Sequence, residues 1–175
     1  MSVREYESRL NLDEAVIIAL GGNLAGDYGS CEALLEAALV GFAAAGLPVV
    51  RRSSWWTSTA WPDPSAPAYR NGVVFVETQM GPWEAMTALL EIELRFGRVR
   101  SAKNASRTLD LDLIAFGRRV MDSSDLVLPH PRAHERAFVM GPLAALAPEW
   151  VHPVLGLTAQ QLAANAQVGS DAAPS

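Results

Sequence analysis

Leucine and aspartate alternate in the run Leu-Asp-Leu-Asp-Leu at positions 109–113, and this run limits the local fold more than any other segment of the chain. In a β-strand, side chains at positions i and i+2 leave the same face, so Asp110 and Asp112 would point together while the leucines pack behind them. Two carboxylates on one face repel each other unless a cation lies between them. Mg²⁺ suits such a place because it takes one or two carboxylates and leaves its other positions to water and phosphate oxygens.

Three arginines lie close to this strand in the sequence, at Arg98, Arg100 and Arg107. A planar guanidinium offers paired donors that match phosphate oxygens. Carboxylates, a divalent metal and arginines together predict a nucleoside triphosphate site. A half-buried strand with a solvated outer face would alternate in the same way. Aspartate is depleted in strands, however, so two on one face favour the functional interpretation.

Chain length and charge narrow the class of protein. The chain has 175 residues, 50% of them hydrophobic and 19% charged, which is enough for one domain with a buried core. The formal net charge of −5 argues against a nucleic-acid partner. The single Cys31 cannot form an internal disulfide. The apolar run at 15–20 is too short for a signal peptide or a membrane span, so we expect a cytoplasmic protein with no membrane partner.

Apolar patterning predicts strands and helices along the chain. The continuous apolar run at 15–20 is typical of a buried central strand. Residues 30–45 carry apolar side chains at helical spacing, and Gly46 is placed to end that helix. The later predictions are strands at 49–59 and 72–78, a helix at 82–96, a strand at 109–115, short strands near 120 and at 126–128, and a helix at 132–146.

The order of these elements predicts an α+β fold. It matches the ferredoxin-like β-α-β-β-α-β sandwich, with an added hairpin and a C-terminal helix. We expect residues 1–14 to be an N-terminal extension and residues 15–157 to be the domain. Residues 158–175 are rich in alanine, and we expect a tail that is partly disordered at its end.

Five short motifs follow one another in a specific order. They are Ala-Leu-Gly-Gly-Asn-Leu at 19–24, Tyr-Arg-Asn at 69–71, Phe-Gly-Arg-Val-Arg at 96–100, Arg-Thr-Leu-Asp-Leu-Asp at 107–112 and Leu-Pro-His-Pro-Arg at 128–132. Over about residues 15–155, the chain resembles the 6-hydroxymethyl-7,8-dihydropterin pyrophosphokinases. Enzymes of that family transfer the terminal diphosphate of ATP to a pterin alcohol in folate biosynthesis. The resemblance implies the same activity here, with ATP and the pterin as partners of a monomeric enzyme.

The resemblance implies a role for particular residues on the ATP side. Asp110 and Asp112 match the pair that holds two Mg²⁺ ions against the triphosphate, and Arg98 and Arg107 match arginines that grip the phosphates, so these four are the implied catalytic residues. Further ATP-side positions are Glu93, Arg100, Leu113, His130 and Arg136. Glu93 also lies on the apolar stripe of its predicted helix, where a carboxylate needs a partner, so we expect a ligand or an arginine beside it.

The resemblance also implies a pterin pocket. Tyr69 and Phe138 match two rings that sandwich the pterin, and Asn71 matches the residue that binds its amide edge. The backbone around Ser58, Thr59 and Trp61 would complete the pocket. Facing rings exclude water from a flat heterocycle, and a carboxamide both donates and accepts along one edge. From the residues alone, core packing is the alternative for the two rings, and a rigid turn is the alternative for His130.

Three other classes of protein remain open from the residues alone. A metal-dependent nucleotide phosphohydrolase could use the same carboxylates, although it would usually need more histidine and aspartate ligands. An RNA-binding module could have this fold, but it would need exposed aromatic residues on its strands. A non-catalytic nucleotide or pterin binder would keep both pockets without turnover.

Overall fold

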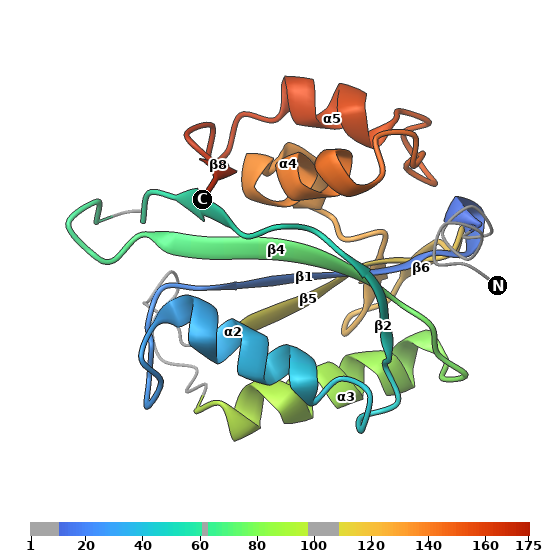
Figure 1. The fold of residues 1–175 in the computed structure, drawn as a ribbon. Coiled ribbons are helices and arrows are strands. Elements are labelled where there is room, and N and C mark those ends of the chain that lie inside the picture. The colour runs from blue at the N-terminus through green and yellow to red at the C-terminus, as the bar shows by residue number, and fades with distance from the viewer. Residues whose placement is uncertain (1–10, 61–62, 98–108) are drawn as a thin grey trace, which may run out of the picture.

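The computed structural model describes residues 11–60, 63–97 and 109–175 (Figure 1). Trp61, Arg98, Arg100 and Arg107 lie outside the described residues, so their predicted roles stay predictions. Within the described ranges, no helix is long and apolar enough to span a membrane.

A six-stranded antiparallel sheet forms the middle layer of the described structure. Its strands are β1 (Val16–Gly22), β2 (Val49–Arg52), β3 (Trp56–Ser58), β4 (Tyr69–Val76), β5 (Asp110–Phe116) and β8 (Ala173–Pro174). The order across the sheet is β5-β1-β4-β3-β8, and β2 also pairs with β4. A separate hairpin is made of β6 (Met121–Asp122) and β7 (Val127–Leu128). The apolar run that predicted a buried strand is therefore the centre of the sheet.

Helices cover both faces of this sheet (Figure 1). On one face lie α2 (Cys31–Val40) and α3 (Pro82–Arg95), and on the other lie α4 (Ala137–Leu146) and α5 (Ala159–Asn165). Two 3₁₀ turns complete the described elements, η1 (Leu12–Glu14) and η2 (Ala133–Glu135). The α+β prediction is confirmed, but the molecule has three layers where a simple sandwich has two.

Alternate residues of β1 enter two separate hydrophobic cores. Ile18 and Leu20 pack with residues of α2 and α3, whereas Ile17 and Ala19 pack with residues of α4 and α5. Successive side chains of a strand point to opposite faces, so a strand covered on both faces needs apolar residues throughout. This requirement explains why the run at 15–20 is continuously apolar and not alternating.

Several predicted elements end earlier or divide. The helix predicted at 30–45 ends at Val40, and a turn leads to Gly46, whose φ of +84° suits glycine. The strand predicted at 49–59 is divided into β2 and β3, and the three residues between them, 53–55, belong to neither strand. The helix predicted at 132–146 is divided into η2 and α4 by Arg136, which has extended backbone angles.

The C-terminal segment corrects our expectation of a frayed tail. A capping box between Thr158 and Gln161 starts α5, and Ala159 and Leu162 are buried in the core beside α4. Alanine side chains of both helices pack against this core, among them Ala144 and Ala163. The chain then returns to the sheet, where β8 pairs with β3. The packed structure therefore extends beyond residue 157.

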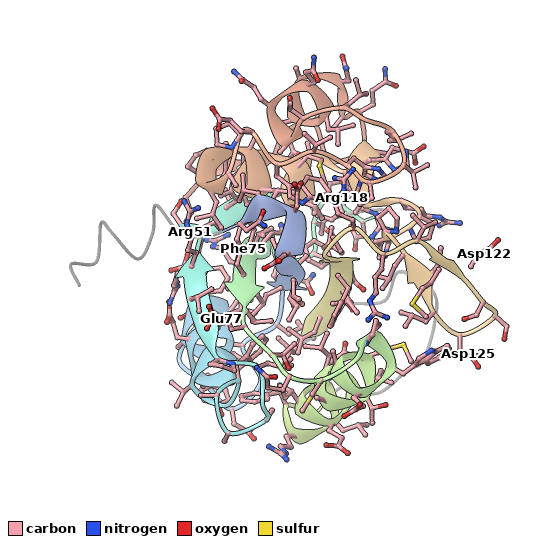
Figure 2. All side chains as sticks on the ribbon, turned by 90° about the vertical axis from the view of Figure 1, so that its right-hand side faces the viewer. Arg51, Phe75, Glu77, Arg118, Asp122 and Asp125 are labelled. Atoms are coloured by element: carbon pink, nitrogen blue, oxygen red, sulfur yellow. The ribbon has the colours of Figure 1, made fainter. Side chains whose placement is uncertain are left out.

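Arg51 joins β2 to the end of α4. Its guanidinium lies over the Phe75 ring, with 5.8 Å between Cζ and the ring centroid, and donates a hydrogen bond of 2.8 Å to the Leu146 carbonyl. Figure 2 shows Arg51 beside Phe75, with the α4 and α5 layer above the sheet. This contact fixes α4 on the face of the sheet that carries the candidate site.

Candidate functional site

Strand β5 carries its two aspartates on one face, as the alternation predicted. Asp110 and Asp112 are half-buried and line a cavity on the α4 side of the sheet. Leu109, Leu111 and Leu113 are buried in the opposite core, against α2 and α3. Leu113 therefore does not line the cavity, although the resemblance implies an ATP-side role for it.

Glu93 supports β5 from the opposite face. Its side chain is only 2% exposed, and its Oε2 accepts a hydrogen bond of 3.2 Å from the backbone N–H of Leu111. The expected partner of this carboxylate therefore includes a backbone donor that lies between the two aspartates in sequence. Glu93 does not line the cavity.

The cavity has a volume of about 1000 Å³ and lies between the sheet and the segment that starts α4. It brings together residues that are distant in the sequence. The predicted site residues that line it are Ser58, Thr59, Tyr69, Asn71, Asp110, Asp112, Arg136 and Phe138. Both predicted halves of the site therefore open into one cavity.

A row of paired backbones forms the floor of this cavity. Gly21 of β1 pairs with Asp110 of β5 on one side and with Asn71 of β4 on the other. Because neighbouring strands lie about 4.8 Å apart, the backbones of Asp110 and Asn71 are roughly 10 Å apart. A Cβ on Gly21 would lie 2.9 Å from Oδ1 of Asn71. The glycine thus leaves room for the carboxamide beside the aspartate.

The end of the cavity around Asn71 is polar at the sheet and aromatic at its sides. Asn71 is 6% exposed, and its Nδ2 donates a hydrogen bond of 3.1 Å to the Ser58 hydroxyl. Tyr69, from the start of β4, and Phe138, from the start of α4, line the same cavity. The Arg136 guanidinium lies over the Phe138 ring, 5.8 Å from its centroid.

His130 lies outside the lining of the cavity. Its Nδ1 accepts hydrogen bonds of 3.1 Å from the backbone N–H groups of Arg132 and Ala133. Burial, followed by the positive charge of Arg136, lowers the pKa of His130 to about 4. The imidazole is therefore neutral at pH 7, with its proton on Nε2.

Sequence reasoning missed the C-terminal part of the cavity wall. Val168, Gly169, Ser170 and Asp171 line the cavity, as do Arg132 and Glu135. Asp171 accepts a hydrogen bond of 2.7 Å from the backbone N–H of Thr59. Arg132 belongs to a motif that we had identified, but a contact between residues 59 and 171 leaves no local pattern in the sequence.

The aspartate pair fits a magnesium ion better than a metal that needs a full protein cage. The described part of the chain contains no group of three or more histidine, cysteine, aspartate or glutamate side chains that could hold a metal. Mg²⁺ needs only one or two carboxylates when substrate phosphates and water fill its other positions. Asp110 and Asp112 satisfy that requirement at the cavity wall.

A cavity with a carboxylate pair at one end and an amide with aromatic rings at the other suits an enzyme that joins a phosphate-bearing ligand to a flat heterocycle. Residues 17–148 match the family model of 7,8-dihydro-6-hydroxymethylpterin-pyrophosphokinase, HPPK. The match covers most of the chain, and the protein belongs to the HPPK family.

Curated relatives agree with the family match. The chain is 44% identical over 147 residues to a 2-amino-4-hydroxy-6-hydroxymethyldihydropteridine pyrophosphokinase of Synechocystis sp., covering 83% of this chain and 73% of the relative. It is 37% identical to the enzyme of that name from Pseudomonas aeruginosa, covering 78% of this chain and 82% of the relative.

Solved structures share the fold. The crystal structure of wild-type Plasmodium falciparum HPPK-DHPS with pteroate superposes with a TM-score of 0.66 at 13% identity, covering 86% of this chain and 44% of that chain. This chain thus spans less than half the length of that two-part protein. At this identity the likeness concerns the fold alone.

Proposed function

We propose that this protein transfers the terminal diphosphate of ATP to the hydroxymethyl group of 6-hydroxymethyl-7,8-dihydropterin, which gives AMP and the pterin diphosphate in folate biosynthesis. Membership of the HPPK family supports this activity. The observation that carries the proposal is the single cavity in which Asp110 and Asp112 lie on the same sheet as Asn71, two strands away.

The Asn71 end of the cavity is the proposed pterin site. Tyr69 and Phe138 stack on the two faces of the pterin, and the Asn71 carboxamide binds its amide edge. The hydrogen bond from Asn71 Nδ2 to Ser58 supports this role, because it fixes the orientation of the carboxamide. Thr59 and Trp61 contribute to the loop that closes this end.

The other end of the cavity is the proposed site for the phosphates of ATP. Asp110 and Asp112 would hold two Mg²⁺ ions, which neutralise the triphosphate and orient it when bound. The resemblance assigns Arg98 and Arg107 to the phosphates, and it assigns Arg100 and Arg136 to the ATP side. Arg136 also lines the cavity. Glu93, Leu113 and His130 are also assigned to the ATP side, as the resemblance implies. Glu93 acts by supporting β5 through the Leu111 N–H, and Leu113 anchors the same strand in the core against α2 and α3. His130 offers the N–H of its neutral ring.

In the proposed reaction, the hydroxymethyl oxygen forms a bond to the β-phosphorus of ATP, and the bond from that phosphorus to the oxygen bridging it to the α-phosphate breaks. AMP leaves with that oxygen, and the hydroxyl proton passes to solvent or to an aspartate. Transfers at phosphorus need little covalent help from a protein. Alignment of the two substrates on one sheet and neutralisation of charge are therefore the main contributions of this chain.

The strand order β5-β1-β4, with β2 and β3 beyond β4, supports the ferredoxin-like connection that the sequence suggests. We also propose that the enzyme is a monomer, as the resemblance implies.

The test is product analysis with purified protein, ATP and Mg²⁺, in the presence and absence of the pterin. We expect AMP to form only when the pterin is present, in a one-to-one ratio with pterin diphosphate. Phosphate release without pterin would indicate a phosphohydrolase. Binding of both ligands without turnover would indicate a non-catalytic binder. Asp112→Asn is the matched control, since it should remove turnover and keep the aromatic end intact.

A further inference from the structure

The segment at 168–171 lies beyond the family match, which ends at residue 148, yet it forms part of the cavity wall. Two hydrogen bonds join its first residue to the end of η2 and the start of α4. The N–H of Ala137 donates to the Val168 carbonyl at 2.8 Å, and the N–H of Val168 donates to the Glu135 carbonyl at 3.0 Å. The segment therefore begins at a fixed place beside Arg136 and Phe138.

Gly169 lies directly against the Phe138 ring. Its φ is +67°, and a Cβ at this position would lie 2.6 Å from Cδ1 of Phe138. Only glycine combines this backbone conformation with so close an approach. The segment therefore supports the ring that we propose stacks on the pterin.

Asp171 joins the same segment to the residue that follows β3. Its Oδ2 accepts a hydrogen bond of 2.7 Å from the N–H of Thr59, just after β3. Hydrogen bonds from Thr59 lower the pKa of Asp171, so the carboxylate is ionised at neutral pH. Two residues later the chain pairs with β3 through Ala173 and Pro174. One short segment thus contacts the Phe138 ring through Gly169 and binds the Thr59 backbone through Asp171.

We propose that residues 168–171 form the outer wall of the pterin site, and that Asp171 is a positioning residue that holds Thr59 at a fixed distance from Phe138. The proposal rests on the proposed function, because it assigns the aromatic end of the cavity to the pterin. A flat ligand gains most when the walls on both sides are fixed before it binds, since no ordering has to accompany binding. Asp171 acts through Thr59 and not by contact with the reacting atoms.

The effect of Asp171 should therefore be confined to the pterin. Losing one charge-assisted hydrogen bond at an exposed position corresponds to about a fivefold change in affinity. We expect Asp171→Ala to raise the KM for the pterin about fivefold, with kcat and the KM for ATP unchanged. Asp171→Asn keeps an acceptor oxygen, so it should recover most of the loss. Asp122→Ala, at an exposed carboxylate on the β6–β7 hairpin, is the control and should match the wild type.

Binding of 6-hydroxymethylpterin, measured by calorimetry without ATP, separates this proposal from the proposed function. If the wild type binds the pterin but forms no AMP, the proposed function fails, and the comparison of Asp171 variants still tests the wall. An unchanged pterin affinity in Asp171→Ala would overturn the proposed role of Asp171. The same conclusion would follow if the variant lost equal affinity for both substrates, if its Tm were lowered, or if Asp171→Asn bound the pterin as weakly as Asp171→Ala.

A second variant tests the wall from its other end. Gly169→Ala places a methyl group against the Phe138 ring, so it should weaken pterin binding while the affinity for a non-hydrolysable ATP analogue stays constant. Normal pterin binding in a folded Gly169→Ala protein would contradict the proposed support of Phe138.

Discussion

The Glu93 carboxylate and the Leu111 N–H join helix α3 to strand β5 by a hydrogen bond of 3.2 Å, at the residue between Asp110 and Asp112. Glu93 lies on one face of the sheet, and the aspartates open into the cavity on the other. The buried Glu93 carboxylate therefore helps to position Asp110 and Asp112, although it does not itself line their cavity.

Replacing this carboxylate should affect stability and activity together. Glu93→Ala leaves the buried N–H of Leu111 without this acceptor, which costs about 1–3 kcal/mol. We expect a lower Tm and a lower kcat, because β5 loses a fixed point beside its aspartates. Glu93→Gln retains an acceptor oxygen, so its Tm and its kcat should fall less than those of Glu93→Ala. Thermal unfolding and steady-state kinetics test this pair, and an Ala variant with wild-type Tm would show that the bond is dispensable.

Replacing the aspartates should affect activity while the fold is kept. Asp110→Asn and Asp112→Asn preserve the size of each side chain, and both positions are only half-buried, so we expect both variants to fold. The rate of AMP formation at saturating ATP and Mg²⁺ should fall by at least about a hundredfold, as is usual when a group that stabilises developing charge is lost. Full turnover in both variants would remove the aspartates from the metal site.

Gly21 offers a test of the cavity floor. A methyl group at this position would meet Oδ1 of Asn71 at 2.9 Å, so Gly21→Ala should turn the carboxamide away from its present orientation. We expect the KM for the pterin to rise by about tenfold, the equivalent of roughly 1.4 kcal/mol. Gly29→Ala is the matched control, because nothing lies within 4 Å of a Cβ there. Similar kinetics in the two variants would mean that the Asn71 orientation does not matter.

Two histidines with lowered pKa values predict how stability depends on pH. Burial lowers the pKa of His130 and of His152 to about 4. The unfolded chain takes up these protons near pH 6.5. The contribution of both groups to the free energy of unfolding is therefore complete above about pH 6.5, decreases as the pH falls, and is lost at about pH 4.

Urea unfolding at pH 7 and pH 5 measures this effect. His152→Asn should reduce the difference in the free energy of unfolding between the two pH values, because asparagine does not titrate. Its side-chain oxygen can accept the hydrogen bonds from the N–H groups of Val154 and Leu155 that Nδ1 now accepts. A variant with an unchanged pH dependence would show that His152 does not contribute.

Local patterns predicted the parts of the site that depend on local geometry. The alternation at 109–113 gave the correct faces for the aspartates and leucines, and the apolar run at 15–20 is the central strand. The helix predicted at 30–45 begins as expected, with Ser30 as its N-cap, but it ends early, because the positions after Val40 form a turn. Patterning reports burial within one element and says little about which face a later helix will cover.

Long-range contacts were beyond the reach of the sequence. The hydrogen bond between Asp171 and Thr59 joins residues 112 positions apart, and the alanine-rich composition near Asp171 suggested a frayed end. The roles of Arg98, Arg100, Arg107 and Trp61 stay predictions from the motifs. The partner of Glu93 was anticipated as an arginine or ligand, and a backbone donor serves as well, because any N–H satisfies a buried carboxylate oxygen.

The pairing of β8 with β3 also has a consequence for solubility. Edge strands of a sheet can pair with strands of other molecules, and proteins commonly prevent this with very short edge strands and with proline. β8 has two residues, and one of them is Pro174, which has no N–H to donate. Beyond β3 the sheet therefore ends in a strand that is a poor template for a neighbouring chain, so the strand that follows residues 168–171 protects the sheet against aggregation.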